Sequence, residues 1–406
     1  MARRRPIVAG LDIGTQKVAM VIAEHTEAGL EILGVGTAVS RGIRAGRVSD
    51  VEKTTQAIGV ALSEAELMAG CQIHQVTVSV SGDHMRGTNS HGVVAIENGE
   101  VSARAARRVI EAAQAVPLPA DQAIIHLMCR EYIVDGQGGI LDPVGINGVR
   151  LEANLHVISA CESALGNMSK CCNKAGLSVA GVVAGPMASA EAVLEPEEKD
   201  LGVALVDFGA GTVDICVFHS GGVVHSSCIT VAGLHVTRDL SRCLETSMRE
   251  AEILKVRHGC ADPGMVHPEL QCEVNGVGGR PPRLLEKAMI AEIVQPRVEE
   301  IFEMVSESIE RSGYADMLTS GIVLTGGAAM MPGMTELASR VMRQQVRLGE
   351  PRGVVGLSDE IDDPSWATAV GLARGLKSSS LTDGLAAGIG ARVMPQWLWR
   401  KWKAYF

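Results

Sequence analysis

Two short segments of this chain combine a carboxylate, glycines and hydroxyl groups in a pattern that suits phosphate chemistry. Residues 7–22, IVAGLDIGTQKVAMVI, and residues 202–218, GVALVDFGAGTVDICVF, each place an acidic, glycine-rich bend between two apolar runs. This arrangement predicts a β-hairpin in both places. The two copies lie about one domain length apart, which predicts an internal repeat of two similar halves. The bend residues are Asp12, Gly14, Thr15 and Lys17 in the first segment and Asp207, Gly209, Gly211 and Thr212 in the second.

Each bend is a candidate phosphate-binding site. Glycine has no Cβ, so the backbone N–H groups of such a bend can converge on an anion. The two threonines add hydroxyl donors, while Asp12 and Asp207 can each hold a hydrated Mg²⁺ against the phosphates. A single bend of this kind is more often only a turn, but two copies heading similar halves favour a pair of facing phosphate clamps. Lys17 is a further candidate phosphate ligand, although a solvated strand lysine accounts for it nearly as well.

A third glycine turn lies in GIVLTGGAAMMPGM, residues 321–334. Its pattern predicts a strand at 322–324 and a helix from Met334. A glycine pair between a strand and a helix lets a flat group or a phosphate lie against the backbone. Such turns are common in α/β proteins, so this turn supports a binding site only in combination with the two bends. Its residues are Gly326, Gly327 and Ala328.

The composition excludes several classes of protein. A chain of 406 residues exceeds what one hydrophobic core usually organises, which predicts two or more subdomains. A net charge of −10 argues against nucleic acid as a partner. Ten cysteines without a CxxC pair indicate reduced thiols rather than a disulfide framework or a zinc site. The N-terminus lacks the apolar region of a secretory signal, and no apolar run reaches the ~18 residues of a membrane span. We therefore expect a cytoplasmic protein unless a segment anchors it.

The strongest helix signal between the two hairpins covers residues 49–70. Ser49-x-x-Glu52 predicts a capping box at its start. An apolar stripe then continues to Gly70, which predicts the end of the helix.

The last thirteen residues, MPQWLWRKWKAYF, hold three of the four tryptophans. At 100° per residue, the apolar side chains of a helix at 391–406 share one face, and basic side chains lie on the other. This helix is too short to cross a bilayer at ~1.5 Å per residue, but it can lie in the interface of an anionic membrane. Docking on its own protein is the alternative, which the Gly/Ser/Ala-rich linker at 377–390 disfavours. The residues expected to contact lipid are Leu398, Trp399, Arg400, Lys401, Trp402, Lys403, Tyr405 and Phe406.

The two bends and the third turn, in this order, resemble the phosphate and adenosine motifs of the actin-like ATPase superfamily. The resemblance implies an α/β fold of two RNase H-like domains, with ATP and Mg²⁺ between them and the metal held by Asp12 and Asp207 through water. It also implies that Glu252 and Lys255, one helical turn apart in AEILKVRHG, contact the nucleoside. Without the resemblance, the same two residues indicate an exposed ion pair.

Longer segments resemble the FtsA family within that superfamily, and the likeness runs from residue 7 to about residue 376. The family implies an inserted subdomain, 1C, in place of the usual 1B. The segments that carry the likeness are SVSGDHMRGTNSHGVVAIEN (79–98), EAAQAVPLPADQAI (111–124), IVDGQGGILDPVGINGVRLEANLHVISA (133–160) and VGGRPPR (277–283). The implied divisions are 1A (1–82, 163–199 and 363–376), 1C (83–162), 2A (200–230 and 311–362), 2B (231–310), a flexible linker (377–390) and a membrane-targeting amphipathic helix (391–406).

The resemblance implies a structural adaptor of cell division. Such a protein binds ATP, polymerises into actin-like filaments and ties the FtsZ ring to the cytoplasmic face of the inner membrane at the division site. Subdomain 2B would receive the FtsZ C-terminal tail, and 1C would contact later division proteins. Arg283 and Arg297 are 14 residues apart, nearly four turns of one helix, so both would face an acidic tail. Pro296 can bend that helix, and solvated surface arginines are an equally good account.

Two other functions stay open at this point. A kinase or a vigorous ATPase would use the same site, but it needs a general base. Glu162, after the strand VISA, is a weak candidate for that catalytic role and is as readily a helix cap. A PilM-like pilus-assembly adaptor is disfavoured by the 1C segments and by the basic, aromatic tail.

The C-terminal pattern yields a prediction for lipid binding. Burying one large aromatic side chain stabilises by roughly 1.5–3 kcal/mol, and a basic residue at an anionic surface contributes about 1 kcal/mol. We therefore expect Trp402→Glu to release the chain from liposomes more completely than Lys403→Ala, and on neutral as well as anionic lipid. Liposome flotation of both variants, and of a chain truncated after Lys377, measures this. Continued flotation of the truncated chain would show that the anchor lies elsewhere.

Overall fold

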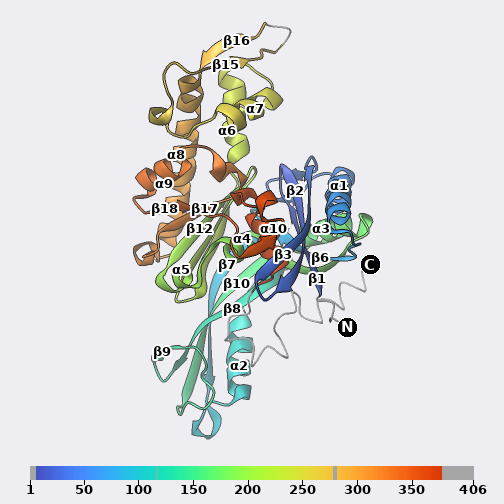
Figure 1. The fold of residues 1–406 in the computed structure, drawn as a ribbon. Coiled ribbons are helices and arrows are strands. Elements are labelled where there is room, and N and C mark those ends of the chain that lie inside the picture. The colour runs from blue at the N-terminus through green and yellow to red at the C-terminus, as the bar shows by residue number, and fades with distance from the viewer. Residues whose placement is uncertain (1–5, 116, 278–280, 377–406) are drawn as a thin grey trace.

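The computed structural model describes residues 6–115, 117–277 and 281–376. The linker and the amphipathic helix predicted at 377–406 lie outside the described residues. Figure 1 shows two sheet-containing halves side by side, a mostly helical tip above the second half and an inserted sheet below them. No helix in the described part combines the length and the apolar character needed to cross a membrane.

The first half is built on a six-stranded sheet in the order β11-β6-β1-β2-β3-β19. β1 (Ile7–Ile13) and β2 (Lys17–Thr26) form the first predicted hairpin, and residues 18–23 of β2 are fully buried. A strand that is apolar without alternation is covered on both faces. The remaining elements of this half are β3 (Gly29–Val39), β4 (Ile43–Arg44), β5 (Arg47–Val48), β6 (Gln75–Val80), β11 (Ser178–Ala184), β19 (Val354–Gly356), α1 (Val51–Ala69), α3 (Glu162–Lys174), α4 (Gly185–Val193) and α10 (Ala367–Arg374).

Two glycines let helices lie directly on opposite faces of this sheet. A Cβ at Gly36 of β3 would lie 2.0 Å from the carbonyl oxygen of Ala61 in α1. A Cβ at Gly10 of β1 would lie 2.5 Å from the carbonyl oxygen of Ala369 in α10. Gly36 and Leu11 both pair with Met20 of the middle strand β2, so they face the same side of the sheet. Gly10 precedes Leu11 and therefore faces the opposite side. α1 and α10 therefore cover the sheet from both sides.

Helix α1 begins one residue later than the sequence predicts. Its N-cap is Asp50, whose carboxylate accepts the backbone N–H of Lys53 at 3.1 Å, whereas the Ser49 hydroxyl donates to the carbonyl of Gly42. Asp50 caps the helix in preference to Ser49 because its negative charge also interacts favourably with the positive end of the helix dipole. The predicted capping box is therefore wrong, while the predicted end at Gly70 is confirmed by its left-handed φ of 64°.

The second half is built on a five-stranded sheet in the order β14-β13-β12-β17-β18. β12 (Val203–Phe208) and β13 (Val213–His219) form the second predicted hairpin. The long helix α8 packs against this sheet, with the Phe302 ring edge-on to Phe208 at 5.9 Å. The strand and the helix predicted around the third turn are both present. The other elements are β14 (Gly222–Ile229), β17 (Ile322–Thr325), β18 (Val346–Leu348), α5 (Pro196–Leu201), α8 (Lys287–Arg311) and α9 (Met334–Met342).

The tip above the second half contains two helices and a two-stranded hairpin beside the N-terminal part of α8 (Figure 1). Arg283 lies on the strand β16, and α8 begins only at Lys287. The prediction that Arg283 and Arg297 share one continuous helix is therefore wrong, because the chain is extended through Glu286. The elements of the tip are α6 (Gly233–Cys243), α7 (Met248–His258), β15 (Gln271–Val274) and β16 (Arg283–Glu286).

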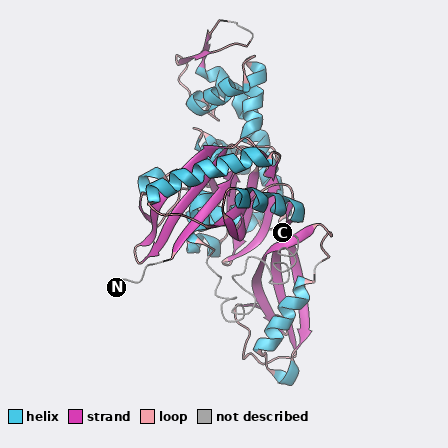
Figure 2. Ribbon diagram, turned by 90° about the vertical axis from the view of Figure 1, so that its right-hand side faces the viewer, coloured by secondary structure: helices cyan, strands magenta, loops and turns pink. Residues whose placement is uncertain are grey.

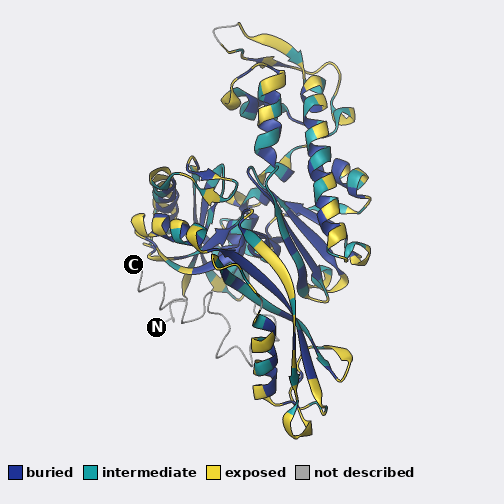
Figure 3. Cartoon of the chain, turned by 180° about the vertical axis from the view of Figure 1, so that it is seen from behind, coloured by how far each residue is buried: buried dark blue, intermediate teal, exposed yellow. Residues whose placement is uncertain are grey.

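Between β6 and α3 the chain forms a separate four-stranded sheet, β7-β10-β8-β9, which we call the insert (residues 85–161). Helix α2 packs along this sheet, as Figure 2 shows, and the two enclose a hydrophobic core of their own. Figure 3 shows that the outer strands and the far end of the insert are largely exposed. The elements of the insert are β7 (Met85–Ala95), α2 (Ala103–Gln114), β8 (Gln122–Val134), β9 (Gln137–Ile140) and β10 (Arg150–Cys161).

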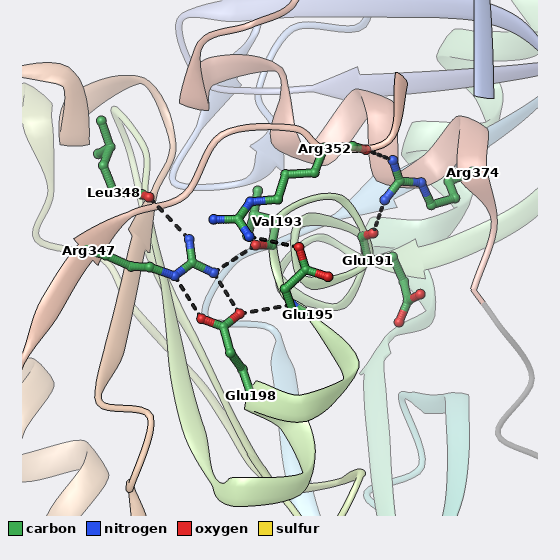
Figure 4. Close-up of polar contacts among 8 residues, drawn as sticks. All are labelled: Glu191, Val193, Glu195, Glu198, Arg347, Leu348, Arg352 and Arg374. Atoms are coloured by element: carbon green, nitrogen blue, oxygen red, sulfur yellow. Dashed lines mark hydrogen bonds and ion pairs between the residues drawn. The ribbon is translucent and has the colours of Figure 1, made fainter. Parts of the chain in front are cut away.

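The chain passes between the halves twice, through α5 and through the segment from β18 to β19, and arginines tie these two crossings together (Figure 4). Arg347 donates to both carboxylate oxygens of Glu198, at 2.7 and 2.6 Å, and to the carbonyl of Val193 at 2.9 Å. We call this group the crossing cluster. Its further contacts are Arg352 with the Glu195 carboxylate at 2.7 Å and Arg374 with the Glu191 carbonyl at 2.6 Å.

The crossing cluster yields a stability prediction. Glu198→Gln keeps the shape of the side chain but removes the charge from a two-bond contact in which both partners are mostly buried. We expect a loss of about 2 kcal/mol, because hydrogen bonds to charged groups are the stronger ones. Arg311→Gln is the matched control, since the Arg311–Glu307 pair is exposed and should contribute less than about 1 kcal/mol. Urea unfolding measures both, and equal midpoints would contradict the prediction.

Candidate functional site

The fold brings the two predicted bends into contact. A Cβ at Gly211 would lie 2.3 Å from the hydroxyl oxygen of Thr15, so the second bend touches the first. Each bend is closed by the same backbone hydrogen bond, from Gly14 to Lys17 at 3.0 Å and from Gly209 to Thr212 at 2.9 Å. By position in the bend, the counterpart of Thr212 is therefore Lys17 rather than Thr15. The two bends of the internal repeat therefore share the same closing hydrogen bond as well as similar residues.

Asp12 and Asp207 are the next-to-last residues of β1 and β12, and their charges interact. Asp12 accepts a hydrogen bond from the Ser79 hydroxyl at 2.6 Å, and Asp207 accepts bonds from Ser189 at 2.6 Å and Thr368 at 3.2 Å. Burial raises the pKa of Asp12 to about 6; the Ser79 bond opposes this, and the negative charge of Asp207 adds to it. Burial also raises the pKa of Asp207. Both carboxylates therefore lack a countercharge sufficient to offset their desolvation.

Asp214 is a third carboxylate at this place, which the sequence analysis missed. It lies opposite Asp207 on β13 and is 5% exposed. One of its oxygens accepts bonds from Ser81 and, at 3.0 Å, from Thr212, while Oδ1 has no hydrogen-bond partner among the described residues. Burial raises its pKa to about 6, and the charge of Asp207 acts in the same direction. The available signal was a single charged residue inside the apolar run VDICVF.

Lys17 is held by the turn that precedes α10. Its ammonium group donates to the Ser365 carbonyl at 3.0 Å and to the Ser365 hydroxyl at 2.7 Å. The same group lies 4.4 Å from the centre of the Trp366 ring, within the range of a cation–π contact. Burial lowers the pKa of Lys17, while the charges of Asp12 and Asp363 raise it. Lys17 is therefore a partly buried cation beside the first bend and not a solvated strand lysine.

The third turn packs against the second bend. Gly326 has a φ of 90°, and a Cβ there would lie 2.4 Å from a carboxylate oxygen of Asp207. Gly327 opens the short 3₁₀ turn that follows, and the Ala328 Cβ is 3.3 Å from the Cβ position of Gly233 at the start of α6. The Gly233 N–H donates in turn to the carbonyl of Gly209. Only glycine fits at position 326, because the left-handed backbone and the close carboxylate both exclude a side chain.

Glu252 and Lys255 lie beside this cluster on α7. The Lys255 ammonium donates to Glu252 at 2.9 Å and to the carbonyl of Gly233 at 3.2 Å. The Thr237 hydroxyl donates to Glu252 at 2.5 Å. For Glu252, burial favours a higher pKa, but the charge of Lys255 and the hydrogen bonds from Lys255, Thr237 and Gln16 give a net lowering. With side chains only 24% and 10% exposed, the two residues do not form a solvated surface pair.

Three further candidate residues lie away from the bends. Glu162 is exposed in the first turn of α3, and its backbone N–H donates to the Asp121 carbonyl. Arg283 donates to the Leu244 carbonyl at 2.8 Å. Arg297 is paired with Asp239 at 2.6 Å and with Glu300. Both arginines already have partners within the tip.

Comparison with known proteins gives one consistent family. A family model described as cell division protein FtsA matches residues 204–371, and one described as the SHS2 domain inserted in FtsA matches residues 82–159. The chain is 43% identical over 385 residues to the cell division protein FtsA of Pseudomonas aeruginosa, covering 94% of this chain and 92% of the relative. It is 39% identical to that of Escherichia coli K12, with the same coverage of 94% and 92%.

Solved structures with similar folds are more distant in sequence. The PilM–PilN type IV pilus biogenesis complex matches with a TM-score of 0.66 at 16% identity, covering 92% of this chain and 100% of that chain. MreB5 of Spiroplasma citri bound to ADP matches with a TM-score of 0.55 at 13% identity, covering 91% and 95%. This likeness concerns the fold, and the predicted actin-like architecture is confirmed.

The raised pKa of Asp214 predicts how stability varies with pH. Between the unfolded pKa of 3.8 and the folded pKa of about 6, the folded chain holds a proton that the unfolded chain has lost. Asp214 therefore stabilises the fold at low pH, and this contribution is lost as the pH rises through about 6. Relative to Asp214→Asn, wild-type stability should fall between pH 4 and pH 7, by on the order of 2 kcal/mol.

Urea unfolding of both proteins across this pH range measures the difference. The comparison with Asp214→Asn is needed because two histidines also make stability depend on pH. Burial lowers the pKa of His156 to about 3 and that of His126 to about 4, so both favour the folded state as the pH rises. They are present in both proteins and cancel. A difference that does not change with pH would contradict the prediction.

Proposed function

The chain belongs to the FtsA family of cell division proteins, and from this premise we propose that it binds ATP with Mg²⁺ where its two halves meet. One observation carries the proposal: two equivalent glycine bends, one from each half, touch at Thr15 and Gly211 beside the partly buried carboxylates of Asp12 and Asp207. The Gly14 and Gly209 N–H groups close the bends, and the other backbone N–H groups of such bends can face an anion. ATP bound there would contact both halves at once, as a ligand between the domains of an actin-like fold does.

The side chains present fit a hydrated magnesium ion. Asp12 and Asp207 are hard oxygen donors, and their raised pKa values reflect negative charge without a sufficient countercharge. We assign the metal to these two residues through water. The metal supplies charge neutralisation for the phosphates when bound. The residues assigned to the phosphates are Gly14, Thr15, Lys17, Gly209, Gly211 and Thr212, and those assigned to the nucleoside are Glu252, Lys255, Gly326, Gly327 and Ala328.

We further propose that the protein works as a peripheral adaptor at the division site. Residues 391–406 would bind anionic lipid on the cytoplasmic face of the inner membrane, filaments of the actin-like body would array many such helices, and avidity would rise with their number. The tip would receive the FtsZ tail, and the insert would contact later division proteins. At the tip, an acidic tail competes with Asp239 and Glu300 for Arg297, so Arg283 is the more available of the two cations.

Asp214 favours a second activity, slow hydrolysis of the bound nucleotide. Asp214 lies opposite Asp207 in the strand pairing, and burial raises its pKa, so it accepts a proton more readily than an ordinary carboxylate does. From the sequence, Glu162 is the weak candidate for this role. A kinase or a fast ATPase remains the alternative, and turnover near the ~10 s⁻¹ median of enzymes would favour it.

The nucleotide assignment is tested by titrating MgATP into variants of the full chain. Asp12→Ala and Asp207→Ala should each weaken binding at least tenfold, because each removes one of two charged partners of the hydrated metal. Asp83→Ala is the control, since Asp83 forms an exposed pair with Arg47 in the first half. Turnover of wild type and Asp214→Asn, measured on the same samples, should be slow and should drop further in the variant. Unchanged affinity in both Asp12→Ala and Asp207→Ala would overturn the assignment.

A further inference from the structure

The insert contacts the second half of the molecule although it is inserted into the first. Its strands β7, β8 and β10 lie against β14 of the second sheet, and Figure 1 shows these strands meeting at the centre of the molecule. A Cβ at Gly87 of β7 would lie 2.2 Å from the Ser226 hydroxyl and 2.6 Å from the Ser226 carbonyl oxygen on β14. β7 passes β14 so closely that only glycine fits there.

A buried histidine joins the two elements beside Gly87. His156 of β10 is 1% exposed, and its ring nitrogens lie 2.6 Å from the Asn89 side-chain oxygen and 2.9 Å from the Ser226 hydroxyl. The amide nitrogen of Asn89 donates to the Val224 carbonyl at 3.1 Å, so its oxygen is the acceptor for His156. His156 then carries its proton on Nδ1 and accepts from Ser226 at Nε2. Burial, with smaller effects from the charges of His225 and Arg130, lowers the pKa of His156 to about 3, so the ring stays neutral.

A second contact lies on the neighbouring strand of the insert. Arg130 of β8 donates to the hydroxyl of Tyr314, and its guanidinium group lies 5.5 Å from the centre of the same ring. The Tyr314 ring lies 5.8 Å from that of His219, at the end of β13. Hydrogen bond and ring contact together place a cation of the insert against an aromatic pair of the second half. We call the His156–Ser226, Asn89–Val224 and Arg130–Tyr314 interactions the strap contact.

We propose that the insert acts as a strap between the halves, so that its docking on β14 and ligand binding at the two bends regulate each other. Within the described residues, the halves are joined covalently only through the two chain crossings, and a rotation about those crossings would move β14 relative to the first sheet. The insert is anchored in the first half, so such a rotation either breaks the strap contact or carries the insert with the second half. A partner bound to the insert would then change nucleotide affinity by the same factor by which the nucleotide changes partner affinity. This inference rests on the proposed nucleotide site.

The test releases the strap without touching the bends. Ser226→Ala with Tyr314→Phe removes two hydroxyl groups and keeps both side-chain shapes close to the original, and Gly87→Ala pushes β7 away from β14. His91→Ala is the matched control, because His91 pairs with Glu152 at 2.7 Å within the insert. The readouts are hydrogen exchange in residues 85–95 and 222–229 of the full chain, and the rate at which MgATP dissociates.

We expect both strap variants to exchange faster in these two strands than the control, and to release MgATP roughly five- to tenfold faster, as the loss of one or two hydrogen bonds of the strap contact implies. MgATP should also slow exchange in residues 85–95 of the wild type. Faster exchange with unchanged MgATP release would overturn the coupling, and unchanged exchange in both variants would overturn the strap contact itself. A wild-type chain that binds no MgATP refutes the proposed function, a result distinct from both.

Discussion

Three carboxylates with restricted access to water, one buried and two partly buried, lie at one place and are the constraint around which the molecule is organised. Asp12 comes from the first half, and Asp207 and Asp214 come from the second. Desolvation raises the pKa of each, and the hydroxyl groups of Ser79, Ser189, Thr368, Ser81 and Thr212 offset only part of that cost. Such an arrangement is unfavourable for folding alone. A ligand that brings positive charge to this place, as the proposed MgATP would, would offset that cost.

The two halves meet at these carboxylates, and further contacts elsewhere hold the halves together. The crossing cluster connects the two chain crossings through arginines that donate to carboxylates and carbonyl groups. The insert adds a second junction through His156 and Arg130. One hydrophobic cluster also runs through the first sheet, the base of the insert and one face of the second sheet. The halves are therefore linked by two polar junctions and by a hydrophobic cluster that they share.

Membership of the FtsA family and the likeness to PilM and MreB carry different weights. Identity of 43% over nearly the whole chain places this protein in a family of division proteins. Likeness to the pilus and MreB structures at 13–16% identity concerns the fold alone. The insert marks the difference, since residues 82–159 match the domain found inserted in FtsA. The insert also contacts β14 of the second half, so it connects the two halves in addition to presenting an exposed surface.

The sequence alone determined the features that depend on neighbouring residues. Both hairpins, the third turn, the helix that ends at Gly70 and the pairing of Glu252 with Lys255 follow from local periodicity, glycine placement and helical spacing. Tertiary structure decided what depends on partners far along the chain. Asp50 rather than Ser49 caps α1, Arg283 lies on a strand, and Lys17 is bound by Ser365, 348 residues away. Asp214 was missed for the same reason, because its partner Ser81 comes from the other half. Local sequence patterns specify which side chains the strands, turns and helices carry. Only the packing of distant segments decides which of these side chains are buried and which contact one another.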